Sequence, residues 1–228
     1  MTHQAVILVG GKGTRLRLLT SKIPKPLLIV NGRPFVQYLI EYVRSAGFEN
    51  IVLLVGPYRS QFENAFGTGA HLGVTLTYWS EPEQSGTGTA IARARPCLEQ
   101  EFLLLNGDTL FEFDICDFIK RPMTGSCLAR MALAKLDESA RYGTVRLSGD
   151  YVLNFYEKAI GRGGIINAGA YWIDRDIIKE ITDPPCSLEN DIFPALSKRR
   201  LIRGFVYSGK FIDIGVPEDL VRAQKVLG

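Results

Sequence analysis

Leu8-Val9-Gly10-Gly11-Lys12-Gly13-Thr14-Arg15-Leu16 stands near the start of the chain, and Pro24-Lys25-Pro26 follows it. The apolar run that leads into it, residues 5–9, is typical of a buried strand. The three glycines allow the backbone to approach a ligand closely and to point N–H groups at it. Cations beside such a loop suit an anion, most often phosphate. We therefore interpret the stretch as a nucleotide phosphate site on which Arg15 and Lys25 converge.

Two familiar phosphate loops do not match this stretch. The dinucleotide pattern G-x-G-x-x-G, started at Gly11, needs a third glycine where Leu16 stands. The Walker A pattern G-x-x-x-x-G-K-[ST], aligned on Gly11 and Lys12, needs a glycine where Val6 stands. A strand-to-loop turn that uses glycine for its geometry alone is the alternative. The cations that follow the glycines favour the phosphate site.

The bulk composition bounds the class of protein. The chain has 228 residues, with 46% hydrophobic and 22% charged residues, as in a soluble globular protein of one large α/β domain or two small ones. Its net charge of +3 permits anionic substrates and argues against a large nucleic-acid-binding face. No apolar run approaches the roughly 20 residues of a membrane helix. We expect no membrane partner and no signal peptide.

The few cysteines and histidines of the chain do not form the pattern of a metal centre or of a nucleophilic site. The cysteines, Cys97, Cys116, Cys127 and Cys186, are scattered and form no C-x-x-C pair, which indicates reduced residues of a cytoplasmic protein. The two histidines are far apart in the chain, so a zinc site or a histidine-based triad is not expected.

Strand and helix patterns alternate through the first part of the chain. Apolar residues spaced by three, four and seven predict a helix over residues 35–46, and a shorter helix is predicted over 59–66. Continuous apolar runs predict strands over 51–55 and 74–79. This alternation implies a parallel sheet covered by helices on both faces, with its active site at the carboxyl ends of the strands.

Two later strands end in a carboxylate. The predicted strand 102–105 runs into Asn106-Gly107-Asp108, and the strand that starts at Phe211 reaches Asp213. A carboxylate at the carboxyl end of a buried strand is a favoured metal ligand, and with a nucleoside triphosphate the implied ion is Mg²⁺. An ordinary strand-ending turn is the alternative, since Asn-Gly-Asp is also good turn chemistry.

The second part of the chain changes pattern. Segment 81–90 is rich in glycine and threonine and leads into a predicted helix over 90–98; it could contact a nucleoside or be a linker with a helix cap. Strands joined by turns are then expected over 127–136, 143–147, 152–158 and 165–173, as a mixed sheet. A closing helix is predicted from Pro217.

Polar residues within these later segments have both functional and structural interpretations. Lys158 could hold a second phosphate, and Glu157 could accept hydrogen bonds from sugar hydroxyls, unless the pair is only a solvated edge. Asn167 needs a polar partner, which a sugar hydroxyl or a neighbouring backbone group would supply. Ser187 is interpreted as the cap of a helix.

Taken in order, the motifs G-G-x-G-T-R-L, P-K-P, N-G-D, E-K, N-A-G and D-I-G-x-P resemble the sugar-1-phosphate nucleotidyltransferases over nearly the whole chain. The resemblance implies an α/β, Rossmann-like three-layer fold with a mostly parallel mixed central sheet. It implies a single domain over 1–228, with a nucleotide-binding part of about 1–115 and a sugar-phosphate-binding part of about 116–228. Its members join a nucleoside triphosphate to a sugar 1-phosphate with Mg²⁺ and release pyrophosphate.

Within that family the segments R-Y-G-T-V, S-L-E-x-D and F-I-D-I-G-x-P-E-D are similar to those of D-glycero-α-D-manno-heptose 1-phosphate guanylyltransferases. That similarity implies GTP and a heptose 1-phosphate as substrates, a GDP-heptose product for capsule or lipopolysaccharide, and a possible homodimer. Mannose-1-phosphate guanylyltransferases and related uridylyl- and thymidylyltransferases carry similar stretches and remain the alternative.

The family resemblance also implies a role for each matching residue. Arg15 and Lys25 are the catalytic cations. The nucleotide contacts are Leu8, Gly10, Gly11, Gly13, Thr14, Gln84, Gly86 and Thr87. The sugar-phosphate contacts are Asn106, Gly143, Glu157, Lys158 and Asn167. The metal ligands are Asp108 and Asp213. The chain departs from the family where Ala159 replaces the proline of E-K-P, which loosens the expectation for that loop.

The expected chemistry needs no protein nucleophile. A phosphate oxygen of the sugar 1-phosphate can attack the α-phosphorus directly, so positioning and electrostatics carry the catalysis. A glycosyltransferase with a similar core is a second hypothesis, but it would show D-x-D where Asp108-Thr109-Leu110 stands. A non-catalytic nucleotide sensor is a third, and it would be favoured by loss of the lysine or the carboxylates, which are present.

Overall fold

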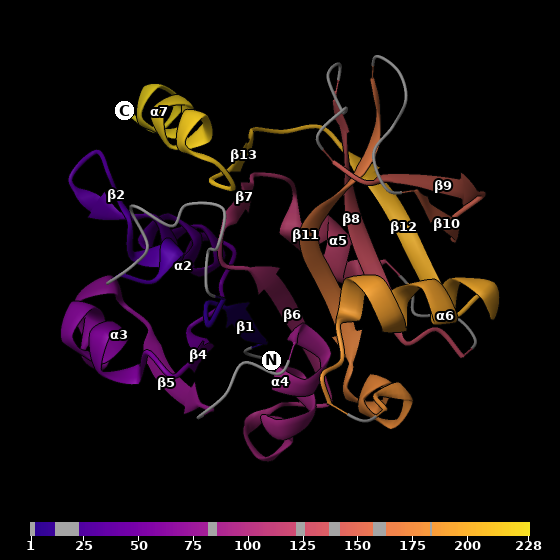
Figure 1. Ribbon diagram of the computed structural model, residues 1–228, viewed down its shortest axis with the longest axis horizontal. Helices are drawn as coiled ribbons and strands as arrows, with labels where there is room; N and C mark the ends of the chain where they lie inside the picture. Colours follow the sequence, from indigo (N-terminus) through magenta and orange to yellow (C-terminus); the bar gives the residue numbers. More distant parts are fainter. Residues whose placement is uncertain are drawn as a thin grey trace. The chain divides into compact units, whose positions relative to one another are not determined.

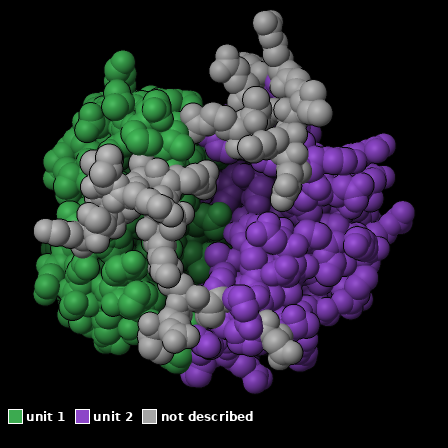
Figure 2. All heavy atoms as spheres, viewed as in Figure 1, with its two compact units in different colours: residues 1–84, 104–110, 211–228 green, residues 85–103, 111–210 purple. Residues whose placement is uncertain are grey.

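The computed structural model describes residues 3–11, 23–81, 86–121, 126–136, 142–156, 163–182 and 184–228. The chain forms two compact units, coloured separately in Figure 2. Unit 1 takes in residues 1–84, 104–110 and 211–228, and unit 2 takes in residues 85–103 and 111–210. The chain therefore passes between the units at four points. The single domain, with its nucleotide-binding and sugar-phosphate-binding parts, stays a prediction.

Unit 1 holds the parallel sheet that the alternating pattern predicts. Its strands lie in the order β5-β4-β1-β6, and β1 pairs in parallel with β4, which pairs in parallel with β5. These strands are β1 (Gln4–Leu8), β4 (Asn50–Gly56), β5 (Thr75–Ser80) and β6 (Glu101–Asn106). The middle of β1 is fully buried, as a continuous apolar run requires in a sheet covered on both faces.

Helices and two small ribbons complete unit 1 (Figure 1). The predicted helices 35–46 and 59–66 are confirmed, and so is the closing helix that begins at Pro217. The helices are α2 (Phe35–Ser45), α3 (Arg59–Phe66), α7 (Pro217–Val226) and the 3₁₀ turns η2 (Lys25–Leu27) and η3 (Ala70–Leu72). The ribbons pair β2 (Ile29–Val30) with β3 (Arg33–Pro34), and β7 (Thr109–Phe111) with β13 (Phe211–Asp213).

Unit 2 holds the mixed part of the sheet, in the order β11-β8-β12-β10-β9. Strand β8 pairs antiparallel with β11 and parallel with β12, and β9 pairs antiparallel with β10. Its strands are β8 (Ala129–Leu136), β9 (Thr144–Ser148), β10 (Tyr151–Tyr156), β11 (Gly164–Asp174) and β12 (Ile202–Tyr207). The mixed character is as predicted, whereas β12 was not foreseen.

The helices of unit 2 are short, and one of them differs from its prediction. They are α4 (Thr87–Arg93), η4 (Arg95–Cys97), α5 (Ile115–Lys120), η5 (Arg175–Glu180), the π-helical η6 (Leu188–Ile192) and α6 (Phe193–Lys198). The helix predicted over 90–98 begins earlier, at Thr87, and gives way to the 3₁₀ turn at Arg95. Pro96 explains the change because it has no N–H to continue the helix.

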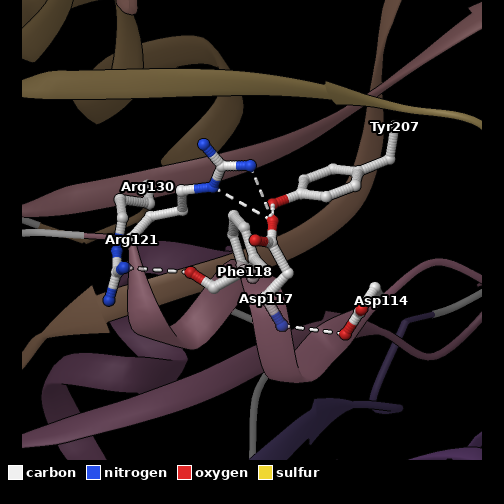
Figure 3. Close-up of polar contacts among 6 residues, drawn as sticks. All are labelled: Asp114, Asp117, Phe118, Arg121, Arg130 and Tyr207. Atoms are coloured by element: carbon white, nitrogen blue, oxygen red, sulfur yellow. Dashed lines mark hydrogen bonds and ion pairs between the residues drawn. The ribbon is translucent and has the colours of Figure 1, made fainter.

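Helix α5 was missed because six residues are too few for a periodic signal, and tertiary contacts hold it in place (Figure 3). At its start, the Asp117 N–H donates to Asp114 Oδ1 at 2.8 Å. At its end, the buried Arg130 of β8 donates to the carbonyl oxygens of Phe118 at 2.9 Å and Ile119 at 3.2 Å. The hydroxyl of Tyr207, in β12, donates to Asp117 Oδ2 at 2.7 Å. A buried cation thus satisfies carbonyls that a helix end leaves without donors.

The glycine loop after β1 approaches the end of β4 closely. A Cβ added to Gly10 would lie 2.8 Å from the backbone nitrogen of Gly56, which itself has a φ of +55°. Among the described residues, no atom lies within 4 Å of a Cβ added to Gly11. Packing within the protein therefore requires glycine at position 10 but not at position 11.

This difference predicts opposite outcomes for two neighbouring substitutions. Gly10→Ala should lower the free energy of unfolding by about 1–3 kcal/mol, because a methyl group would press on the Gly56 backbone. Gly11→Ala is the matched control and should leave it almost unchanged. Urea unfolding followed by circular dichroism measures both. Equal stability of the two variants would contradict the packing argument.

Among the described residues, no helix has both the length and the apolar character needed to cross a membrane.

Candidate active site

The end of β1 and the end of β6 lie side by side in unit 1. The backbone N–H of Gly107 donates to the carbonyl oxygen of Leu8 at 2.9 Å, and a Cβ on Gly107 would lie 2.5 Å from that oxygen. The strand ends therefore bring the Gly10-Gly11 backbone and the turn Asn106-Gly107-Asp108 to one place. Of the predicted phosphate loop, Gly13, Thr14 and Arg15 lie outside the described residues.

Lys25 reaches this place from the 3₁₀ turn η2. Pro24 precedes the turn with an extended ψ of 139°, and Pro26 lies within it, so the P-K-P motif sets the local backbone. The Lys25 side chain is 7% exposed, and its Nζ contacts Asp108 Oδ2 at 2.6 Å. The lysine is thus an almost buried cation whose charge is neutralised by a carboxylate from the strand end.

Asp108 and Asp213 come together because β7 pairs with β13. The backbone N–H of Ile214 donates to the carbonyl oxygen of Asp108 at 3.0 Å, and that of Gly215 donates to Asp213 Oδ1 at 2.8 Å. The Thr109 hydroxyl lies 3.2 Å from Asp108 Oδ1 and 3.2 Å from Asp213 Oδ2. The structure therefore unites the two carboxylates that the sequence marks as metal ligands.

The pKa of Asp213 shows how the charges of this cluster act on one another. Burial raises the pKa of Asp213 above its usual value, and the nearby Asp108 carboxylate raises it further. Lys25 and the Gly215 N–H lower that pKa, but only in part. A further cation placed between the acids would relieve their repulsion.

The residues present fit a hard divalent cation such as Mg²⁺. Carboxylate oxygens are the ligands this ion prefers, and it commonly takes only one or two of them together with phosphate oxygens. Over the described part of the chain, no group of three or more His, Cys, Asp or Glu residues forms a self-sufficient metal site. Asn106 adds a buried side-chain oxygen for which the described structure offers no hydrogen-bond donor.

The predicted nucleoside contacts of unit 2 are fixed by a neighbouring segment. A Cβ on Gly86, whose φ is +91°, would lie 2.3 Å from the carbonyl oxygen of Cys186. The Thr87 hydroxyl donates to Glu189 Oε2 at 2.7 Å and accepts from the Leu188 N–H at 2.9 Å. Contacts within the protein therefore explain why position 86 is glycine and position 87 is threonine. A nucleoside would have to be contacted by the backbone groups of these residues.

The predicted sugar-phosphate contacts of unit 2 are only partly described. Asn167 lies in β11, where its Nδ2 donates to the Tyr171 hydroxyl at 2.8 Å and its Oδ1 accepts from the Gly169 N–H at 3.0 Å. A backbone partner for Asn167 was one of the two alternatives, and it is the one observed. Gly143 is exposed beside the carbonyl of Tyr156, with 3.2 Å between that oxygen and an added Cβ. Gln84, Glu157 and Lys158 lie outside the described residues.

Sequence reasoning missed two residues at these places. Thr109 was noted only because it does not form D-x-D, and nothing in its type or spacing marks it. Glu189 belongs to Ser187-Leu188-Glu189-Asn190-Asp191, which was interpreted as structural. The capping part of that interpretation is confirmed, since the Ser187 hydroxyl accepts from the Asn190 N–H at 3.2 Å.

The raised pKa of Asp213 predicts an unusual stability profile for the metal-free protein. The folded state binds this proton more tightly than the unfolded chain, so the stability that this one group contributes is fully present below its ordinary pKa of 3.8 and is lost as the pH rises through the folded-state pKa. Asp213→Asn removes the charge and keeps an acceptor for Gly215. The Tm of this variant at pH 7 without metal should therefore exceed that of the wild type. The difference in Tm between the two proteins should become smaller towards pH 4.

The matched control is Asp150→Asn, because Asp150 is 58% exposed and should leave the Tm unchanged. Added Mg²⁺ should raise the Tm of the wild type more than that of Asp213→Asn. A lower Tm for Asp213→Asn at pH 7 without metal would contradict the electrostatic argument.

Comparison with known proteins gives matches over the whole chain. A D-glycero-alpha-D-manno-heptose 1-phosphate guanylyltransferase of Aneurinibacillus thermoaerophilus is 35% identical over 226 residues, which are 98% of each chain. A mannose-1-phosphate guanylyltransferase of Mycobacterium tuberculosis is 35% identical over 98% of this chain but 64% of its own length. The crystal structure of HddC from Yersinia pseudotuberculosis complexed with GMP-PN has a TM-score of 0.88 and 31% identity, covering 99% of this chain and 100% of that one.

These matches confirm the Rossmann-like α/β fold that the sequence resemblance implied. Residues 4–227 match the family described as Nucleotidyl transferase. The ordered motifs, the fold and the matched length agree, and the chain belongs to the nucleotidyl transferase family.

Proposed function

We propose that this enzyme joins GTP to D-glycero-α-D-manno-heptose 1-phosphate and releases pyrophosphate, yielding a GDP-heptose. The observation that carries the proposal is the match of 98% of the chain to 98% of a relative of that name, at 35% identity. The HddC structure complexed with a guanine nucleotide analogue, GMP-PN, supports the choice of base.

The proposed reaction exchanges one phosphorus–oxygen bond for another. A phosphate oxygen of the sugar 1-phosphate forms a bond to the α-phosphorus of GTP, and the bond from that phosphorus to the pyrophosphate oxygen breaks. Both reactants are anions, so the protein's task is to bring them together and to stabilise charge on the departing pyrophosphate. No side chain has to form a covalent intermediate.

Unit 1 would supply the groups for the triphosphate. The backbone of Leu8, Gly10 and Gly11 lies at the strand end, and Gly11 leaves open the space that a ligand needs. Lys25, already desolvated beside Asp108, would stabilise phosphate charge together with Arg15. Asp108 and Asp213 would hold Mg²⁺, which would neutralise part of the phosphate charge.

For the same reaction we also propose the remaining nucleotide and sugar-phosphate contacts. Gly13, Thr14, Gln84, Gly86 and Thr87 would complete the nucleotide contacts. Asn106, Gly143, Glu157, Lys158 and Asn167 would take the sugar phosphate. Asn106 is the best supported of these, because its buried oxygen could accept a hydrogen bond from a sugar hydroxyl. We further propose a cytoplasmic homodimer whose product supplies capsule or lipopolysaccharide synthesis.

Mannose 1-phosphate is the second candidate substrate, because the Mycobacterium tuberculosis relative reaches the same 35% identity. That relative is longer, since this chain covers 64% of its length.

A matrix of substrates tests the proposal. Pyrophosphate release is measured for GTP, ATP, UTP and dTTP, each with heptose, mannose and glucose 1-phosphate and with Mg²⁺. We expect the highest kcat/KM for GTP with the heptose 1-phosphate. A higher value with mannose 1-phosphate would move the enzyme to the second candidate, and release with UTP or dTTP alone would overturn guanylyl transfer.

The role of Lys25 has its own test. Lys25→Ala should lower kcat/KM by about 100-fold or more, because a preorganised cation is lost where charge develops. Lys225→Ala is the matched control, since Lys225 is exposed on α7 and should leave the rate unchanged. A soluble, folded Lys25→Ala enzyme with a near-normal rate would refute the assignment.

A further inference from the structure

The hydroxyl of Thr109 stands between the two carboxylates of the candidate site. Thr109 is the first residue of β7 and is 8% exposed. Its Oγ1 lies 3.2 Å from Asp108 Oδ1 and 3.2 Å from Asp213 Oδ2. These distances exceed the usual 2.7–2.8 Å of an O–H···O bond. A hydroxyl has only one proton, so the geometry is that of one donor shared between two acceptors.

Every oxygen of the two carboxylates then has a contact. Asp108 Oδ2 is held by Lys25 Nζ at 2.6 Å, and Asp213 Oδ1 by the Gly215 N–H at 2.8 Å. Thr109 contacts the remaining oxygen on each acid. Each carboxylate is thus fixed at both oxygens, and Thr109 is the only group described here that contacts both.

We infer that Thr109 is a positioning residue, which sets the orientation of Asp108 and Asp213 toward a shared divalent cation. The inference rests on the proposed function, because that function assigns the cation to these two acids. Mg²⁺ demands a narrow octahedral geometry, so the cost of orienting its ligands falls if the protein orients them beforehand. Hydrogen-bonding partners of metal ligands commonly have this role.

The side chain of threonine suits the task better than a longer polar residue. Its branched Cβ restricts χ1, so the hydroxyl stays where the strand backbone puts it. The paired strands β7 and β13 hold that backbone, and the Ile214 N–H bond to the Asp108 carbonyl fixes their ends. Among the described residues Thr109 has no hydrogen bond with a cationic side chain, so its effect on a metal ion would pass through the two acids.

Mn²⁺ binding to the protein without substrates is the measurement, with free Mn²⁺ followed by electron paramagnetic resonance. Thr109→Val keeps the shape and removes the hydroxyl, and it should weaken Mn²⁺ binding by about tenfold or more. Thr109→Ser restores the hydroxyl and should recover most of the affinity. Thr77→Val is the matched control, because Thr77 is an exposed threonine of β5 in the same unit.

The outcomes separate this inference from the proposed function. Equal Mn²⁺ affinity of wild type and Thr109→Val overturns the inference, including the case in which neither binds. The proposed function fails separately, if the wild type releases no pyrophosphate with any substrate pair. Thermal melting shows whether each variant folds, and Thr109→Ala replaces Thr109→Val if the latter does not. A similar loss of affinity in Thr109→Ser and Thr109→Val also overturns the inference, since the hydroxyl would then be irrelevant.

Discussion

The contact between Lys25 and the Asp108–Asp213 pair is the interaction on which the candidate site depends. Lys25 and Asp108 are 83 residues apart in the chain, and Thr109 and Asp213 are 104 apart. The lysine is almost buried and the two acids are half-buried, and removing charges from water is costly unless each charge is paired. Hydrogen bonds from Thr109 and Gly215 complete the pairing only in part, because the pKa of Asp213 is still raised.

Such an arrangement of charges contributes little to the stability of the fold, but it suits a site that binds a cation. A buried ion pair is often no more stabilising than an apolar pair of the same size. Here a second carboxylate is added, and among the described residues Lys25 is the cation that lowers the pKa of Asp213. That pKa stays raised, so added positive charge would stabilise the two ionised acids. A bound divalent ion would supply that charge. Carboxyl groups with a perturbed pKa, such as Asp213, cluster at functional sites.

The glycines and polar residues of the motifs divide into structural and functional ones. Gly10 and Gly86 are required by backbone contacts with Gly56 and Cys186. Thr87 and Asn167 have their polar groups engaged within the protein. Gly11, in contrast, has open space around it, which fits a residue kept small for a ligand. A shared motif therefore mixes positions that the fold requires with positions that contacts within the described structure do not explain.

The sequence by itself determined the parallel strands, the helices α2, α3 and α7, and the two strand-ending acids. It could do so because continuous apolar runs, helical periodicity and strand ends are local signals. It also indicated the family, since ordered motifs span nearly the whole chain. Only the tertiary structure decided that Thr109 joins Asp108 to Asp213, that Arg130 holds the short helix α5, and that Asn167 bonds its own strand. These contacts depend on which segments meet in space, and neither residue type nor spacing records that.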